Sequence, residues 1–186
     1  MRYLVLLVVG VLLSGCATTS PVVDYDSSQD FQKYRTFAFI SDNPLLIDDG
    51  ASGVSPLLQG RLMNTATTIL QAEGYVQAAS REDADFMIGF TIGARDKMSV
   101  SSYPEFYRPY YSHWGWGGPY YGHNDVEVTQ YTQGILAVDL YDVSTRKPVW
   151  HGVATKKITG SMRSNPDEAV REILGAILAD FPPNNG

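Results

Sequence analysis

The stretch GILAVDLYDVSTRKPVWHGVA, residues 134–154, decides the fold because it carries two strand patterns on either side of a short polar turn. Its first half has apolar or small residues at alternate positions: Gly134, Leu136, Val138 and Leu140. A period of two places these side chains on one face of a strand. Residues 149–154 repeat the strand signal, and residues 142–148 are rich in turn formers. The sequence therefore predicts a β-hairpin at the centre of the domain.

Other strand patterns lie on the N-terminal side of this hairpin. We expect strands at residues 22–26 and 36–40, a surface loop at residues 41–54, a short edge strand at residues 75–78, and a long strand from Asp85. Gly89 and Gly93 share one side of the long strand, where they leave room for a neighbouring element or allow the sheet to bend. The alternation fades over residues 97–102 and returns at Val126, which leads into the central hairpin.

Two amphipathic helices are predicted. Ser55 stands where a cap is needed, Pro56 suits the first helical position, and Gly74 suits the residue after the last turn. The second helix begins at Asn165, which has capping-box spacing to Glu168. Apolar residues recur at helical spacing in both segments: Leu58, Leu62, Ala66, Ile69 and Leu70 in the first, and Val170, Ile173, Leu174, Ile177, Leu178 and Phe181 in the second.

This order of elements predicts an α+β fold. We expect a two-layer sandwich in which a mixed, mostly antiparallel sheet carries both helices on one face, as a single domain over residues 22–183. Trp150, Gly152 and Ala154 share one face of the last strand, and the two small residues let a helix pack close to the indole. That face is expected to be the core.

The first sixteen residues predict export and lipidation. A positive start is followed by an apolar run over residues 3–13, which is too short to span a bilayer as a helix. The run ends in Leu13-Ser14-Gly15-Cys16, which resembles a bacterial lipobox. We therefore expect residues 1–15 to be a lipoprotein signal peptide cleaved between Gly15 and Cys16. Cys16 would then carry covalent diacylglycerol and N-acyl lipid such as palmitate, and no other cofactor is predicted.

Residues 16–21 are expected to be an acylated tether. Ala17, rather than Asp, follows the cysteine, which favours the cell outer membrane over the inner membrane, with the domain facing the periplasm. The segment can span less than ~20 Å at ~3.5 Å per residue, so the domain would lie close to the bilayer. Without residues 1–15 the chain has 13 Lys and Arg against 20 Asp and Glu, which argues against nucleic-acid binding.

An aromatic, Gly-rich insertion is expected at about residues 96–125. Residues 103–123 hold nine of the 22 aromatic residues of the chain. The segment is interpreted as a surface for an envelope protein or cell-wall polymer, because Tyr and Trp bury large areas and keep a polar tip. Packing on the open sheet face and insertion into the lipid interface are the alternatives. The candidate partner-binding residues are Tyr107, Tyr110, Tyr111, Trp114, Trp116, Tyr120 and Tyr121.

Metal and catalytic sites are not predicted. His113 and His123 could approach Asp125 or Glu127, but their spacing matches no compact metal site. The chain has no G-x-S-x-G elbow and no phosphate-binding loop, and lipidation would consume the one cysteine.

Two aspartates near the hairpin turn were considered as an acid and base pair. Asp139 and Asp142 are three positions apart and so point to opposite sides of a strand. Asp142 is interpreted as a turn former and Asp139 as an outward strand residue.

The lipobox and a set of short motifs together resemble a bacterial lipoprotein family called domain of unknown function 4136. The motifs are Asp24-Tyr25-Asp26, Asp30-Phe31-x-x-Tyr34-x-Thr36-Phe37, Ala84-Asp85-Phe86, Gly134-x-Leu136-x-Val138-Asp139-Leu140-x-Asp142, Val149-Trp150-x-Gly152-x-Ala154 and Phe181-Pro182-Pro183. The resemblance implies location and fold, and it brings no catalytic residues. The expected function is that of a non-enzymatic interaction or structural module on the envelope. The alternative is a cell-wall polymer-binding module or a small hydrolase.

Overall fold

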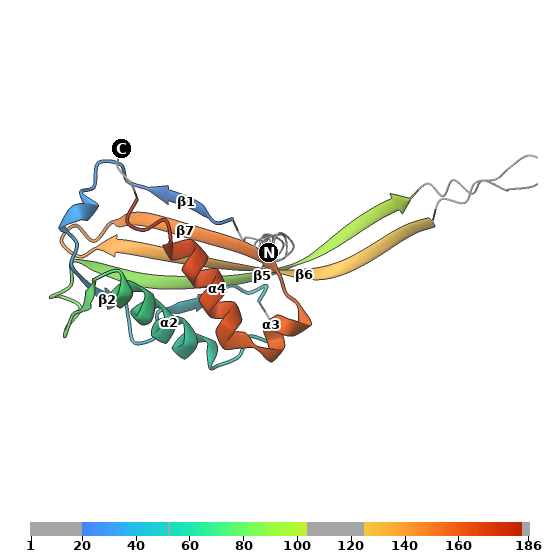
Figure 1. Cartoon of the computed structure of the whole chain (residues 1–186), viewed down its shortest axis with the longest axis horizontal. Coiled ribbons are helices and arrows are strands. Elements are labelled where there is room, and N and C mark those ends of the chain that lie inside the picture. The colour runs from blue at the N-terminus through green and yellow to red at the C-terminus, as the bar shows by residue number, and fades with distance from the viewer. Residues whose placement is uncertain (1–19, 52, 104–124, 184–186) are drawn as a thin grey trace, which may run out of the picture.

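The computed structural model describes residues 20–51, 53–103 and 125–183, which form one sheet covered by helices on one face (Figure 1). This arrangement confirms the predicted α+β sandwich. The strands are β1 Val22–Tyr25, β2 Thr36–Phe39, β3 Leu45–Ile47, β4 Val76–Gln77, β5 Phe86–Tyr103, β6 Asp125–Asp142 and β7 Pro148–Lys157. The helices are α2 Leu58–Ala72, α3 Gly160–Ser164 and α4 Pro166–Leu178, with a 3-10 turn η2 at Phe31–Lys33.

The sheet order is β1-β7-β6-β5-β2-β4, with β3 also paired to β5. The central β6–β7 hairpin is antiparallel and places Val138 opposite Gly152 and Leu140 opposite Trp150. The β1–β7, β7–β6 and β6–β5 pairs are antiparallel, whereas β2 and β3 run parallel to β5. The predicted hairpin is therefore the middle of the sheet.

Strand β5 is longer than the sequence pattern indicates, whereas β6 begins within one residue of the predicted return of the pattern at Val126. The expected fading over residues 97–102 was wrong, because each strand has 18 residues and the pairing runs from Phe86 opposite Asp142 to Tyr103 opposite Asp125. Figure 1 shows the distal half of this ribbon extending beyond the helices. Met98 on this part of β5 is 64% exposed, and an exposed strand needs no apolar alternation.

The expected surface loop at residues 41–54 contains strand β3, which the sequence analysis missed. Leu45 pairs with Phe90 and Ile47 with Ile92, so β3 continues along the edge of β5 that β2 occupies first. Three residues are too few to establish a period, and β3 is defined by its partner strand. The helix α3 was missed because its five residues are also too few to establish a period.

The helix boundaries differ from prediction at their starts. Helix α2 begins at Leu58, and Ser55 makes the preceding turn, accepting the Leu57 amide on Oγ at 3.3 Å. The capping box expected at Asn165 is wrong, because that side chain makes no cap hydrogen bond. The end of α2 agrees with prediction: Gly74 has φ +93°, and the Tyr75 amide donates to the Leu70 carbonyl at 2.9 Å.

The core lies between the sheet and the two long helices, which cover the same face as predicted. The helices run side by side in the same direction. Arg61 of α2 pairs with Asp167 near the start of α4, and Tyr75 contacts Phe181 beyond their ends. Gly152 lets α4 approach the sheet, because a Cβ there would lie 2.7 Å from Cγ2 of Ile177. The largest fully buried side chains include Trp150, Phe31, Phe37, Phe86, Phe90, Leu62, Leu70 and Leu174.

Candidate ligand-binding site

A pocket of 570 Å³ opens at the end of the sandwich where α2 and α4 begin. Its walls come from β5, β6 and β7, from residues 50, 51 and 53–55, and from all three helices. The buried core residues Leu62, Leu136 and Val170 lie at its inner side. Beyond them the sheet and the helices no longer fill the space between the layers. The site is therefore a gap between layers that are close-packed elsewhere.

The pocket combines an apolar wall with a charged margin. Ile92 of β5, Ile158 directly after β7 and Ile173 of α4 are half-buried apolar side chains. The charged lining residues are Arg61, Lys156, Arg163 and Asp96. An apolar concavity with a few polar groups is typical of small-molecule sites, whose volumes are about 300–1,000 Å³.

Two of the cations belong to ion pairs whose acidic partners lie outside the pocket. Arg61 Nε lies 2.9 Å from Oδ1 of Asp167, and Lys156 pairs with Glu172. The side chains of Arg61 and Lys156 are 22% and 27% exposed, against 70% and 50% for Asp167 and Glu172. The positive end of each pair therefore lines the pocket, and the negative end faces solvent.

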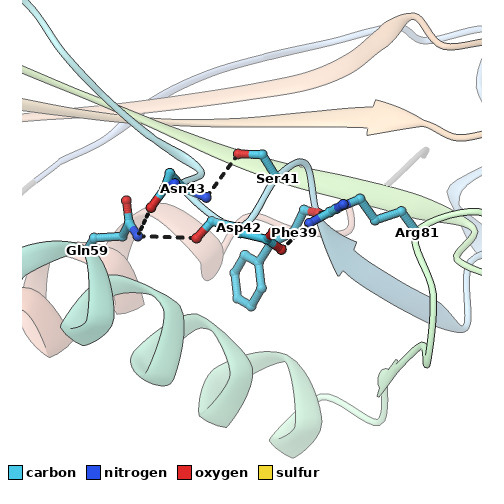
Figure 2. Close-up of polar contacts among 6 residues, drawn as sticks. All are labelled: Phe39, Ser41, Asp42, Asn43, Gln59 and Arg81. Carbon is cyan, nitrogen blue, oxygen red and sulfur yellow. Dashed lines mark hydrogen bonds and ion pairs between the residues drawn. The ribbon is translucent and has the colours of Figure 1, made fainter.

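A polar cluster holds the first turn of α2 to the corner between β2 and β3 (Figure 2). Gln59 Nε2 donates to the Asp42 carbonyl at 3.3 Å and to Asn43 Oδ1 at 3.1 Å. Arg81 pairs with the Asp42 carboxylate and donates through Nε to the Phe39 carbonyl at 3.1 Å. Gln59 neighbours Leu58 and is two residues from Arg61, so the cluster fixes the α2 wall of the pocket.

Asp142 is a structural residue at the other end of the sheet. Its Oδ1 accepts hydrogen bonds from Ser144 Oγ at 2.6 Å, the Thr145 amide at 2.7 Å and Thr145 Oγ1 at 2.8 Å. Its Oδ2 accepts the hydroxyl of buried Tyr34 at 3.0 Å. Burial raises the pKa of this carboxyl, but the hydrogen bonds outweigh it and hold the pKa below its ordinary value. The interpretation as a turn former is confirmed.

Asp139 lies on the solvent face of the sheet, as predicted. Its Oδ1 is 2.7 Å from Nδ1 of His151, the residue opposite it on β7. The partner of Asp142 is Tyr34, which lies in the core. The structure therefore brings Asp139 to His151 and keeps it apart from Asp142.

The remaining predicted site residues lie outside the described part of the chain. These are Gly15 and Cys16, together with His113, His123 and the aromatic residues Tyr107, Tyr110, Tyr111, Trp114, Trp116, Tyr120 and Tyr121. Over residues 20–51, 53–103 and 125–183, no group of three His, Cys, Asp or Glu side chains is placed to hold a metal ion. No helix in these same ranges is long and apolar enough to cross a membrane.

Sequence reasoning missed the pocket. Its lining comes from seven separate segments, and the apolar side chains among them carry the same periodic signal as core residues. One feature of the sequence pointed to this end of the sandwich: Gly134 and Ala154 are the small residues of the central hairpin that lie on the pocket wall. Ala154, together with Gly152, was interpreted from the sequence as an aid to helix packing, and Ala154 also lines the pocket.

The sheet order and the lining of the pocket define a small two-layer α+β domain with a cavity at one end. A family model described as Domain of unknown function (DUF4136) matches residues 21–183. The chain therefore belongs to the DUF4136 family.

Solved structures show the same fold at low sequence identity. A DUF4136 family protein from Bacteroides thetaiotaomicron VPI-5482 is similar with a TM-score of 0.55 and 20% identity, over 92% of this chain and 100% of that one. A PDZ domain protein from Parabacteroides distasonis ATCC 8503 is similar with a TM-score of 0.50 and 14% identity, over 89% of this chain and 36% of that one. No curated protein matches the chain.

Proposed function

We propose that this protein is an envelope lipoprotein, anchored through acylated Cys16, that acts by binding rather than by catalysis. The observation that carries the proposal is Leu13-Ser14-Gly15-Cys16 after an apolar run, with Cys16 as the one cysteine of the chain. Two or more acyl chains provide a stable anchor, because each buried methylene contributes about 0.8 kcal/mol.

The geometry of the domain supports a short link to the membrane. Strand β1 begins at Val22, six residues after Cys16, and pairs with Val153 of β7. Six residues span roughly 20 Å at most. Val153 precedes Ala154, which lines the pocket, so the chain enters the domain on the pocket side. Ala17 favours the outer membrane with the domain in the periplasm.

The binding role rests on the aromatic residues from Tyr107 to Tyr121. Strand β5 ends at Tyr103 and strand β6 begins at Asp125. The segment between them therefore starts and finishes at the tip of a ribbon that extends past the helices. Tyr and Trp side chains are well suited to protein interfaces and to stacking on sugars. The proposed partner is an envelope protein or a cell-wall polymer.

Metabolic labelling with a palmitate analogue tests the anchor. We expect the wild-type protein to incorporate the label and to fractionate with the outer membrane, and Cys16→Ala to lose both properties. Ser14→Ala is the matched control, because it keeps a small side chain beside the cleavage site and should still be labelled. An unlabelled wild-type protein, or a Cys16→Ala protein that remains in the membrane, would contradict the proposal.

Photocrosslinking from probes placed at Trp114 and Trp116 tests the binding role in cells. We expect capture of a defined envelope component from these positions and none from a probe at Met98, which is 64% exposed on the β5 side of the ribbon. Binding of isolated peptidoglycan that is lost on deletion of residues 103–123 would favour the polymer. A deletion variant that folds and keeps every envelope partner would contradict an aromatic binding surface.

A further inference from the structure

The pocket at the start of α2 and α4 has the composition of a site for an amphiphile. Its apolar wall includes Leu58, Ile92 and Ile158, all of which remain partly exposed although they line a concavity. Covering such side chains with a hydrocarbon removes apolar area from water, which is favourable. The volume of 570 Å³ suits a molecule of small-lipid size.

The charge of the lining selects the head group. Three cations and one carboxylate line the pocket, although the chain as a whole has a formal net charge of −6. Arg61 and Lys156 present their positive ends inward, and among the described residues Arg163 has no ion-pair partner. The one lining carboxylate, Asp96, accepts a hydrogen bond from Thr132 Oγ1 at 2.9 Å. Within the lining itself three positive groups face one carboxylate, whereas the acidic partners of Arg61 and Lys156 are 70% and 50% exposed and are screened more strongly by solvent.

The start of α2 adds to this preference. Its cap position makes no side-chain hydrogen bond, and its first turn has no acidic residue. The positive end of the helix dipole is therefore not offset by a carboxylate within that turn. Leu58 and Arg61 of the same turn line the pocket, and the Gln59 contacts in Figure 2 hold them in place.

We propose that the pocket binds an anionic amphiphile with a single hydrocarbon chain, whose chain lies against the apolar wall and whose carboxylate or phosphate meets Lys156 and Arg163. The proposal rests on the pocket alone and goes beyond the proposed anchoring and partner binding. If Cys16 carried no lipid, the proposed amphiphile site would be unaffected. If the amphiphile did not bind, the proposed lipid anchor would be unaffected.

Titration calorimetry with three twelve-carbon probes tests the proposal. The probes are laurate, dodecyl phosphate and dodecanol, all kept below the concentrations at which they aggregate. Every core residue of the described chain lies between Phe31 and Phe181, so the chain from Ser20 to Gly186 carries the whole core and can be titrated without the anchor. We expect saturable binding of one or both anions, and the tighter of the two identifies a fatty acid or a lipid phosphate as the natural head group.

Variants separate the pocket from surface association. Ala169→Leu from α4 and Ala94→Leu from β5 fill the cavity from opposite walls and should each weaken binding by about tenfold or more. Lys156→Gln should weaken it about three- to fivefold, and Asp96→Asn should strengthen it by a similar factor. Arg171→Gln is the control, because Arg171 is exposed on α4 and does not line the pocket.

Three results would overturn the proposal. The first is the absence of saturable binding by either anion. The second is equal affinity for dodecanol and for the anions, which would remove the role of the charged margin. The third is unchanged binding in both cavity-filling variants when circular dichroism shows that they are folded.

Discussion

Replacing Gly152 by alanine should destabilise the protein strongly, because the added methyl group has no space on either side. A Cβ at this position would lie 2.3 Å from Cη2 and 2.9 Å from Cζ3 of Trp150, and 2.7 Å from Cγ2 of Ile177. Trp150 and Ile177 are 1% and 0% exposed, so neither side chain can move into solvent. The indole therefore lies over Gly152, and α4 lies against both.

The magnitude follows from the number of close contacts. Overpacking a core by one methyl group costs about 1–3 kcal/mol. Two contacts under 3 Å to the rigid indole and one to a fully buried Ile177 place Gly152→Ala at the upper end, about 3 kcal/mol. For a chain of this length that loss lowers the melting temperature by about 6–12 °C. Gly152 does not have a positive φ, so backbone strain contributes nothing to the effect.

Urea unfolding followed by circular dichroism measures the difference in the free energy of unfolding. Gly175→Ala is the matched control, because Gly175 lies in α4 and an added Cβ would meet no atom within 4 Å. That variant should be more stable than wild type by about 0.5–1 kcal/mol, since alanine is the better helix former.

A double-mutant cycle with Trp150→Phe identifies the contact. Phenylalanine lacks the outer ring atoms that the new methyl group would meet, so Gly152→Ala should cost less on the Trp150→Phe background than on the wild type. A Gly152→Ala protein within about 0.5 kcal/mol of wild type would refute the reasoning, because Gly152 would then not be what allows α4 to approach the sheet.

Three further changes test the polar end of the fold and the helix end. Asp142→Asn should destabilise the protein at pH 7 by about 2 kcal/mol. The pKa of Asp142 is lowered in the folded state, so its carboxylate stabilises the fold above about pH 4, the pKa of an unfolded aspartate, and this stabilisation is lost as the pH falls through the lower folded pKa. The difference in the free energy of unfolding between wild type and Asp142→Asn, measured by urea unfolding, should therefore become smaller in acid. A difference that does not change with pH would contradict this. Tyr34→Phe removes the hydroxyl that Asp142 accepts and should cost about 1.5 kcal/mol by the same assay, whereas no change would show that the bond contributes nothing. Gly74→Ala should lower the free energy of unfolding by about 1 kcal/mol although space is available, because the φ of Gly74 is +93°. Gly60→Ala in α2 is the control and should be neutral or stabilising. Equal effects at the two positions would contradict a conformational cause.

The sequence predicted the elements whose apolar period is complete within one segment. The β6–β7 hairpin and the two helices have long patterns, and the core they form is the predicted one. Strand β3 and the outer half of β5 were missed because their structure depends on a partner strand. The capping box predicted at Asn165 was wrong, because suitable residue types at the right spacing do not determine the rotamer that the Asn165 side chain adopts.

Even less of the candidate site than of the fold could be predicted from the sequence. The pocket lies between Leu136 and Ala154 of the sheet and residues of all three helices, and the spacing between two layers cannot be predicted from the period of either layer. Its charge pattern depends on which end of an ion pair faces inward. Arg61 and Asp167 are far apart in the sequence, so neither their pairing nor the inward direction of the arginine could be predicted.

The motifs by which the family is recognised mostly hold the sandwich together at the end away from the pocket. Tyr34 donates to Asp142, and the Asp85 carboxylate accepts the Thr36 amide at 2.8 Å. Phe181 packs on Trp150 at a ring distance of 5.7 Å. These contacts close the layers around the core. The family motifs therefore account for the scaffold at this end of the sandwich, and the 570 Å³ pocket lies at the opposite end.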